Sequence, residues 1–452
     1  MKLTKLIYEA GIIGCGGAGF PTHAKYNGTI ETIIINGAEC EPLLQTDRYL
    51  MRNKARELIQ AADMLLRETG AGRCVIALKH SYTREIKALE EAIQSFSSSV
   101  SLHRLESFFP AGDEQTIVYE VTGNVVPPGG IPLNVGCVVS NAATLFCIYE
   151  AMEGRPFTQK YLTVTGAVGK PVIAKVPIGT PVSECLKLAG GPLIPDYVVV
   201  NGGPMMGKLL TKEEAENAWV TKTMSGLIVL PADSSIARRS EVTVRHMLNR
   251  AKSACIQCSF CSQLCPRALL GHPLKPHRIM RKLASCHDIT EILDDSDIRN
   301  AALCCECGIC EIFACPMGLQ PRRINGILKG ELAKAGLRYQ RPEGEWKAEP
   351  DRNMRKAPTG RVASRAGVAA YEAVKIDELA VLPSGAAGTV RLALRQSIGA
   401  PSYPVVKDGE RVEEGRLIAV CPDGSMGSAL HASVSGVVKV EEQYLEIKAS
   451  GS

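Results

Sequence analysis

The sequence has few aromatic residues, little net charge and no long apolar segment. Phe, Trp and Tyr make up 5% of its 452 residues, which argues against a surface on which nucleic-acid bases stack. The net charge of +5 is also too small to indicate nucleic-acid binding. No apolar run approaches the ~18 residues of a transmembrane helix. We therefore predict no nucleic-acid partner and no transmembrane segment.

The N-terminal stretch lacks the features of a signal peptide. In MKLTKLIYEAGIIG two lysines precede apolar residues, but Glu9 interrupts the apolar region and no clear cleavage site follows. We expect an amphipathic first helix and a cytoplasmic protein.

The chain is too long for a single hydrophobic core, so a multidomain α/β protein is expected. Residues 1–155 alternate strand-like and helix-like stretches, which predicts a Rossmann-like domain with a parallel sheet. The short strands of residues 156–235 predict a small β-grasp-like module. Residues 381–452 resemble a barrel-sandwich (lipoyl-like) module, but the stretch between its two halves has no lysine for a covalently attached cofactor.

Residues 331–380 are predicted to form a basic linker. Positions 331–365 have little apolar periodicity and contain nine Lys or Arg against five Asp or Glu. A solvated linker is the simpler interpretation, and a segment that wraps the protein or docks an acidic partner is the alternative.

Cysteine is unusually frequent. The sequence contains 17 cysteines, and ten of them lie between Cys255 and Cys315. A disulfide framework suits a small secreted domain, so metal binding is the better explanation. CIQCSFCSQLCP has the C-x2-C-x2-C-x3-C-P spacing of bacterial ferredoxins, and CCECGICEIFACP repeats it with one additional residue. These runs predict two [4Fe–4S] clusters in a ferredoxin-like helical domain at 241–330, and two zinc sites are the alternative.

In two-cluster ferredoxins the last cysteine of each run binds the other cluster. One predicted set of ligands is therefore Cys255, Cys258, Cys261 and Cys315, and the other is Cys304, Cys307, Cys310 and Cys265. Cys305 is out of register, and a bulge must absorb the extra residue before Cys315. Other cysteines in apolar segments, Cys74, Cys137 and Cys147, are interpreted as core residues.

A glycine-rich stretch, GCGGAGFPT, begins at Gly14. Its glycines allow the backbone to approach a ligand closely, and successive N–H groups can form a nest for a phosphate. Nicotinamide donates a hydride whereas an iron–sulfur cluster takes one electron, so a flavin is expected between them.

Four motifs, in order, resemble those of the NADH-binding flavin subunit of respiratory complex I and its relatives. They are the GxGGAGFPT loop with its following lysine, Asn-x-x-Glu-x-Glu-Pro, Gly-acid-Glu and Asn-x-x-Thr. The resemblance implies an FMN site, with NADH as electron donor, formed by Gly14, Gly16, Gly17, Ala18, Gly19, Lys25, Asn36, Glu39, Glu41, Gly112, Asp113, Glu114, Asn141 and Thr144.

The match has departures and alternatives. Ala38 and Ser140 replace an aspartate and an asparagine of the family, and Tyr26 stands near the position of an expected aromatic. Lys25 could be a surface lysine, and the four acidic residues could cap helices or pair with arginines.

The order of the modules resembles two groups of proteins. In the RnfC proteins of Rnf electron-transport complexes the barrel-sandwich module precedes the flavin domain, whereas in the cobalamin reductases of propanediol-utilisation microcompartments it comes last, as here. The second resemblance implies an NADH-dependent oxidoreductase that reduces the cobalt of cobalamin for adenosylation. It also implies a place inside a bacterial microcompartment, with an adenosyltransferase and a shell protein as partners.

The cofactors are expected to carry the chemistry, so no residue is predicted to be a catalytic acid or base. Two alternatives remain: an Rnf-type protein for NADH:ferredoxin electron transfer, and a non-catalytic electron relay or scaffold.

Overall fold

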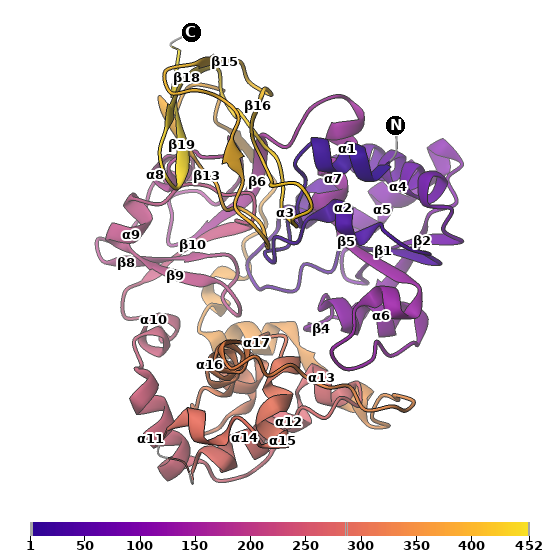
Figure 1. Ribbon diagram of the computed structural model, residues 1–452, viewed down its shortest axis with the longest axis vertical. Coiled ribbons are helices and arrows are strands. Elements are labelled where there is room, and N and C mark those ends of the chain that lie inside the picture. Colours follow the sequence, from indigo (N-terminus) through magenta and orange to yellow (C-terminus); the bar gives the residue numbers. More distant parts are fainter. Residues whose placement is uncertain (1–2, 285, 287, 451–452) are drawn as a thin grey trace.

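The structure, a computed structural model, describes residues 3–284, 286 and 288–450. Figure 1 shows the N-terminal α/β module beside a mixed β-sheet, with a helical module below them and a β module, containing the C-terminus, above. No helix among the described residues is long and apolar enough to cross a membrane.

The N-terminal module contains a four-stranded parallel sheet in the order β3-β2-β1-β5. Its strands are β1 (Thr32–Asn36), β2 (Arg73–Lys79), β3 (Ser101–Leu105) and β5 (Cys137–Asn141). Its helices are α1 (Leu3–Glu9), α2 (Thr22–Lys25), α3 (Thr46–Asn53), α4 (Ala55–Thr69), α5 (Thr83–Phe96), α6 (Glu114–Thr122), α7 (Ala142–Met152) and the short 3-10 helix η1 (Pro132–Val135).

Helices cover both faces of this sheet. Ile33 and Ile35 of β1 share a hydrophobic cluster with residues of α4 and α7, whereas Ile34 packs in another cluster with Ile117 and Val118 of α6. A strand buried on both faces has consecutive apolar residues, such as the three isoleucines of TIIIN. The strand order reverses between β1 and β5, and such a switch point is where open α/β sheets bind ligands.

The second module is a six-stranded mixed sheet in the order β12-β7-β6-β10-β8-β9. Its elements are β6 (Gln159–Gly166), β7 (Val172–Pro177), α8 (Val182–Leu188), β8 (Tyr197–Asn201), β9 (Lys208–Thr211), α9 (Lys212–Glu216) and β10 (Gly226–Pro231). The edge strand β12 (Leu379–Val381) comes from far along the chain and pairs in parallel with β7.

The third module is built from short helices around a core that includes Met247, Leu274, Met280 and Leu328. Its elements are α10 (Ser235–Ser240), α11 (Val244–Ala254), α12 (Phe260–Gln263), α13 (Pro266–Leu269), α14 (Pro276–Leu283), η2 (Ile289–Ile292), α15 (Ser296–Arg299), η3 (Asn300–Leu303), the π-helix η4 (Ile309–Ala314) and α16 (Pro321–Lys334).

The predicted basic linker is not a solvated linker over its whole length. Its later elements are η5 (Arg352–Arg355), β11 (Ala357–Pro358), α17 (Thr359–Ala366), η6 (Ala369–Tyr371) and β12. β11 pairs with β4 (Phe108–Phe109) of the first module, and α17 buries Val362 and Ala363. The Glu120 carboxylate forms ion pairs with Arg352, at 2.6 Å, and with Lys356, at 3.1 Å. The simpler interpretation is therefore wrong here, because apolar and charged contacts hold the segment against the other modules.

The C-terminal module consists of two small sheets, ordered β13-β19-β18-β15 and β14-β16-β17. The strands are β13 (Thr389–Ala393), β14 (Tyr403–Pro404), β15 (Arg411–Val412), β16 (Leu417–Val420), β17 (Leu430–His431), β18 (Gly436–Val440) and β19 (Tyr444–Ala449). The buried Lys222 ties it to the first two modules, because its ammonium donates to the carbonyls of Gly11 and Ala429, each at 2.7 Å.

Candidate functional site

A cavity of about 520 Å³ lies where β1 and β5 end, at the switch point of the parallel sheet. We call it the glycine-loop cavity. Ten of the fourteen residues predicted for the flavin site line it: Gly16, Ala18, Lys25, Asn36, Glu39, Glu41, Gly112, Asp113, Glu114 and Asn141. Four motifs that lie far apart in the sequence therefore meet at one place.

The glycine loop itself is a tight turn closed by a hydrogen bond from Gly14 N–H to the Phe20 carbonyl, at 2.8 Å. Gly17 and Gly19 have φ values of +102° and +65°, which side chains disfavour. A Cβ atom at Gly17 would meet no protein atom within 4 Å. Gly14, Gly17 and Gly19 thus shape the loop, although they do not belong to the cavity wall.

Thr144, the remaining predicted residue, supports the loop from outside the cavity. Its hydroxyl oxygen accepts a hydrogen bond from the backbone N–H of Cys15 at 2.9 Å. Asn141, three residues earlier, caps α7 by accepting from the N–H groups of Ala143 and Thr144. The Asn-x-x-Thr motif thereby fixes the loop to the start of α7.

Lys25 is not a free surface lysine. Its ammonium donates to Glu114 Oε1 at 2.7 Å and to the Val139 carbonyl at 2.9 Å, and its side chain is 25% exposed. Across the cavity, Asn36 Nδ2 donates to the Gly112 carbonyl at 2.8 Å. These contacts hold the first, second and third motifs together.

The half-buried Glu39 and the buried Asp47 form an acidic pair on the cavity wall. The Glu39 carboxylate caps α3 by accepting from the N–H groups of Asp47 and Arg48, at 3.2 and 3.0 Å. Asp47 accepts a 2.5 Å hydrogen bond from Asn141 Nδ2. Burial, reinforced by the charge of Glu39, raises the pKa of Asp47 well above its usual value. Asp47 was not predicted from the sequence, because only the fold brings the start of α3 to the end of β5.

Glu41 has an unsatisfied carboxylate oxygen at the cavity. Its Oε2 accepts from the Met205 N–H at 2.8 Å, whereas the buried Oε1 has no hydrogen-bond partner among the described residues. Burial raises the pKa of Glu41 to about 7, against the effect of the Met205 and Met206 N–H groups. A donor group on a bound ligand would satisfy this oxygen.

Asp113 lines the cavity, but its carboxylate is fully engaged by the protein. It accepts from the N–H of Thr116 at the start of α6 and from both terminal nitrogens of Arg267, at 2.5 and 2.9 Å. Burial would raise the pKa of Asp113, but the Arg267 guanidinium outweighs it and lowers the pKa. In the structure Asp113 therefore pairs with an arginine, which was the alternative role for this residue.

Phe20 is the aromatic residue that the glycine loop contributes to the cavity, whose wall also includes Phe109 and Tyr161. Its ring lies on the wall, with the Lys25 ammonium 5.9 Å from its centroid. Tyr26, the candidate suggested by position, is buried and does not line the cavity. Phe20 was visible in the motif, but only the loop geometry turns it toward the open space.

The two cysteine runs repeat the same backbone conformation. Gln257 and Glu306 both have positive φ, +55° and +57°, and so do Ser259 and Gly308, +63° and +79°. Gln257 is two residues after Cys255, as Glu306 is after Cys304. In this register Cys304, and not Cys305, is equivalent to Cys255.

The extra residue of the second run is taken up by the π-helix η4. A π-turn contains one more residue than an α-turn, so it absorbs a single insertion. The equivalent part of the first run is the α-helical turn α12. The π-helix η4 ends directly at Cys315, whereas α12 leads through Leu264 to Cys265. Both cysteines precede a proline.

The last cysteine of each run lies near the other run. Burial raises the pKa of Cys261 to about 12, with additional effects of the charges of Cys315, Cys255 and Cys258. Burial likewise raises the pKa of Cys265 to about 12, and Cys305 and Cys304 add to it. No three His, Cys, Asp or Glu side chains in the described part of the chain converge closely enough for one metal ion. These charge effects link Cys261 with Cys315, Cys265 with Cys304 and Cys305, and Cys310 with both Cys265 and Cys261.

The second cysteine run also reaches the glycine-loop cavity. Cys305 and Cys307 belong to its wall, as do the loop residues Gly16 and Ala18. One cavity wall thus combines the residues predicted for the flavin site with two cysteines of a run that suits an iron–sulfur cluster.

Comparison with protein families matches four models to consecutive parts of the chain. They are the Nuo51 FMN-binding domain at residues 7–150, the SLBB domain at 161–209, the 4Fe-4S dicluster domain at 254–320 and the RnfC barrel sandwich hybrid domain at 366–452. The predictions of the fold class, of FMN and of [4Fe–4S] clusters are confirmed.

Two curated relatives match nearly the whole chain. The cobalamin reductase PduS of Citrobacter freundii is 39% identical over 447 residues, 98% of this chain and 95% of the relative. PduS of Salmonella typhimurium is also 39% identical, over 99% of this chain and 96% of its own length. The chain belongs to the PduS family. The resemblance drawn from the order of modules is therefore confirmed.

A more distant curated relative matches part of the chain. The C subunit of the Na(+)-translocating ferredoxin:NAD(+) oxidoreductase complex of Acetobacterium woodii is 32% identical over 271 residues, which cover 58% of this chain and 57% of that protein. An NAD+-reducing [NiFe]-hydrogenase structure has 19% identity and a TM-score of 0.49, over 73% of this chain and 62% of its own.

Proposed function

We propose that this PduS-family protein is an NADH-dependent flavin and iron–sulfur oxidoreductase that reduces the cobalt of cobalamin. The observation that carries the proposal is the glycine-loop cavity, whose wall combines the flavin motifs with Cys305 and Cys307 of the second cysteine run. The near full-length similarity to two cobalamin reductases supports the choice of acceptor.

The residues of the cavity fit FMN and a nicotinamide. Bound FMN accepts a hydride, and [4Fe–4S] clusters carry single electrons. Gly16 and Ala18 leave room for a ligand against the backbone, Lys25 provides positive charge, and the free Oε1 of Glu41 accepts a hydrogen bond. Phe20 offers an aromatic face. Asp113 contributes by positioning Arg267 and α6, since its oxygens are already occupied.

The cysteines fit two clusters with crossed ligands. One set is Cys255, Cys258, Cys261 and Cys315, and the other is Cys304, Cys307, Cys310 and Cys265. We place the second set nearer to the flavin, because Cys307 lies on the cavity wall. The arrangement supports a flavin, a near cluster and a far cluster, in that order.

We infer the biological setting from the similarity to the two PduS proteins. We propose that the protein acts in a bacterial microcompartment, where a shell protein holds it and an adenosyltransferase receives the reduced corrinoid. In this setting the enzyme supplies the electrons for cobalamin adenosylation.

The deciding experiment is an anaerobic assay of the protein loaded with FMN and iron–sulfur clusters. NADH should bleach the flavin absorbance within the mixing time of a stopped-flow instrument, and added cob(III)alamin or cob(II)alamin should then be reduced catalytically. Turnover with ferredoxin but not with cobalamin would favour an Rnf-type role. If NADH left the flavin oxidised, the enzyme assignment would fail and a passive relay would remain.

A further inference from the structure

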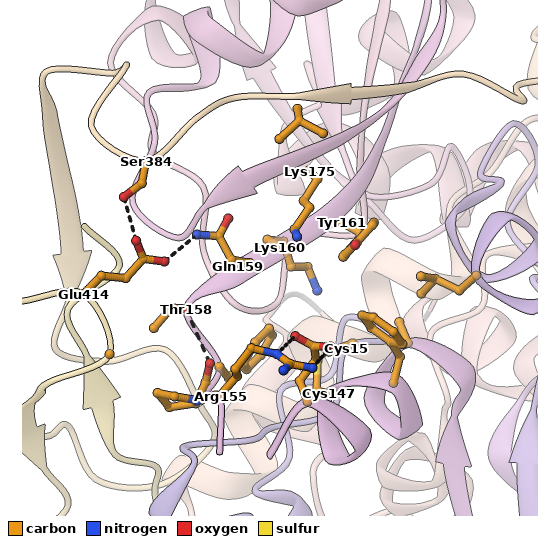
Figure 2. Close-up of a pocket in the computed structure, with 18 of the residues that line it drawn as sticks. Cys15, Cys147, Arg155, Thr158, Gln159, Lys160, Tyr161, Lys175, Ser384 and Glu414 are labelled. Atoms are coloured by element: carbon orange, nitrogen blue, oxygen red, sulfur yellow. Dashed lines mark hydrogen bonds and ion pairs between the residues drawn. The ribbon is translucent and has the colours of Figure 1, made fainter. Parts of the chain in front are cut away.

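A second, larger cavity of about 770 Å³ lies between the first, second and C-terminal modules (Figure 2). We call it the inter-module cavity. Its wall includes α7, the start of β6, and Glu414 of the C-terminal module. The proposed electron path does not use it, yet Cys15, Lys160 and Tyr161 line both this cavity and the glycine-loop cavity.

Two thiols meet at the wall of the inter-module cavity. The sulfur atoms of Cys15 and Cys147 are 3.8 Å apart, although the two residues come from the glycine loop and from the middle of α7. A disulfide has an S–S length of about 2.05 Å, so closure requires a movement of about 1.8 Å. The hydrogen bond from Cys15 N–H to Thr144 already holds the loop against α7, the helix that carries Cys147.

The wall also supplies a positive charge. Lys160 of β6 is only 2% exposed, and Figure 2 shows its side chain directed toward the part of the wall with Cys15 and Cys147. A hydrogen bond from Cys147, together with Lys160 and Thr144, lowers the pKa of the Cys15 thiol to about 6 despite its burial. The first proton of the pair is thus lost near neutral pH, and a thiolate is the reactive form.

The surroundings favour an anionic oxidant of small size. Four cationic side chains line the inter-module cavity, against two acidic ones, Glu150 and Glu414; the cations are Lys54, Arg155, Lys160 and Lys175. Cys147 is half-buried and faces this space, so a reagent can reach the pair without unfolding the protein. Glutathione disulfide, which carries several carboxylates, has the matching chemistry.

We propose that Cys15 and Cys147 form a redox-active dithiol that a small anionic disulfide oxidises to an intramolecular disulfide. The thiolate of the pair attacks the external disulfide, forms a mixed disulfide and releases one thiolate. The second cysteine loses its proton and displaces the other half. Two protein thiols lose two electrons and two protons, and one external disulfide becomes two thiols. Cys147 is thus more than the core residue that its apolar neighbours in the sequence suggested.

The test uses the loaded protein, kept anaerobic and incubated with glutathione disulfide at pH 7. Remaining thiols are then blocked with N-ethylmaleimide, and the digested protein is analysed by mass spectrometry. The expected product is a cross-linked pair of peptides containing Cys15 and Cys147, about 2 Da lighter than their sum because two hydrogens are lost.

Cys147→Ser should abolish the cross-link and leave a glutathione adduct on Cys15, whereas the matched control Cys74→Ser, at another buried thiol, should keep the cross-link. Complete alkylation of Cys15 and Cys147 in the treated wild-type protein would overturn the proposal. So would stable glutathione adducts on the wild-type pair without a cross-link. Both readouts are independent of cobalamin reduction, so they separate this proposal from the proposed function.

Discussion

The two terminal guanidinium nitrogens of Arg267 donate to the two carboxylate oxygens of Asp113, at 2.5 and 2.9 Å, and both side chains are about nine-tenths buried. Arg267 lies two residues after Cys265, and Asp113 caps α6 at the glycine-loop cavity. This pair therefore helps to fix the position of the cysteine-rich module relative to the flavin motifs, together with the contact of the His272 ring with the Val126 carbonyl. A bidentate pair has the directional rigidity for that task.

Removing Arg267 should be strongly destabilising. Arg267→Met leaves the Asp113 carboxylate buried and unpaired, which we expect to cost about 3–5 kcal/mol. Urea unfolding measures the loss, and the exposed pair Arg104–Glu90 provides a control, since Arg104→Met should change stability little. The double variant with Asp113→Asn should recover part of the loss. Equal midpoints for Arg267→Met and Arg104→Met would contradict this role.

The glycine loop should not tolerate a branched side chain at Gly17. Gly17→Val places its side chain in open space near the cavity, so FMN affinity should fall about tenfold or more, while the iron content is kept. Gly70→Val is a matched control, because Gly70 also has positive φ and open surroundings. Both variants should lose about 1–2 kcal/mol of stability from backbone strain. Only Gly17→Val should lose flavin, and stoichiometric FMN in it would refute the loop assignment.

Glu41 should make the stability of the flavin-free protein depend on pH. Its folded pKa is about 7, against an ordinary value of 4.5, so the folded state binds the proton more tightly than the unfolded state. The favourable contribution is complete below pH 4.5 and is lost as pH rises to about 7, by at most ~3 kcal/mol. Across this range the urea midpoint should depend less on pH in Glu41→Gln than in the wild-type protein, whereas the exposed Glu343→Gln should keep the wild-type dependence. An unchanged slope in Glu41→Gln would contradict the shift.

The adjacent cysteines Cys304 and Cys305 should respond differently to substitution. In the repeated backbone pattern Cys304 is equivalent to Cys255, so Cys304→Ser should lose a cluster or force Cys305 into a strained replacement. Cys305→Ser should retain two clusters. Iron and sulfide analysis distinguishes the variants, and the reverse result would mean that the register of the second run is shifted by one residue.

Crossed ligation predicts a long-range effect of Cys315. Because the charge of Cys315 acts on Cys261 of the first run, Cys315→Ala should disturb the cluster bound by that run. Flavin reduction by NADH should persist, while transfer to a one-electron acceptor falls. Electron paramagnetic resonance of the reduced protein can identify the altered cluster. If only the cluster of Cys304, Cys307 and Cys310 changed, two independent local sites would be the correct description.

The sequence alone determined the kinds of module and the residue types of the site. Ferredoxin spacing constrains ligands within a few residues of each other, and the glycine loop has a conformation that few other residues permit, so local sequence carries both signals. The parallel sheet was likewise predictable, because β1 is apolar on both faces.

Only the tertiary structure decided which of these residues share a wall and which of them are already occupied. Asp47, Arg267, Lys160 and the Cys15–Cys147 pair come together from distant segments, so no spacing in the sequence relates them. The wrapping of residues 350–381 was only an alternative at the level of the sequence, since its energy comes from ion pairs and strand pairing with partners more than 200 residues away. Local patterns specify chemistry, whereas burial and long-range packing specify which groups remain free to use it.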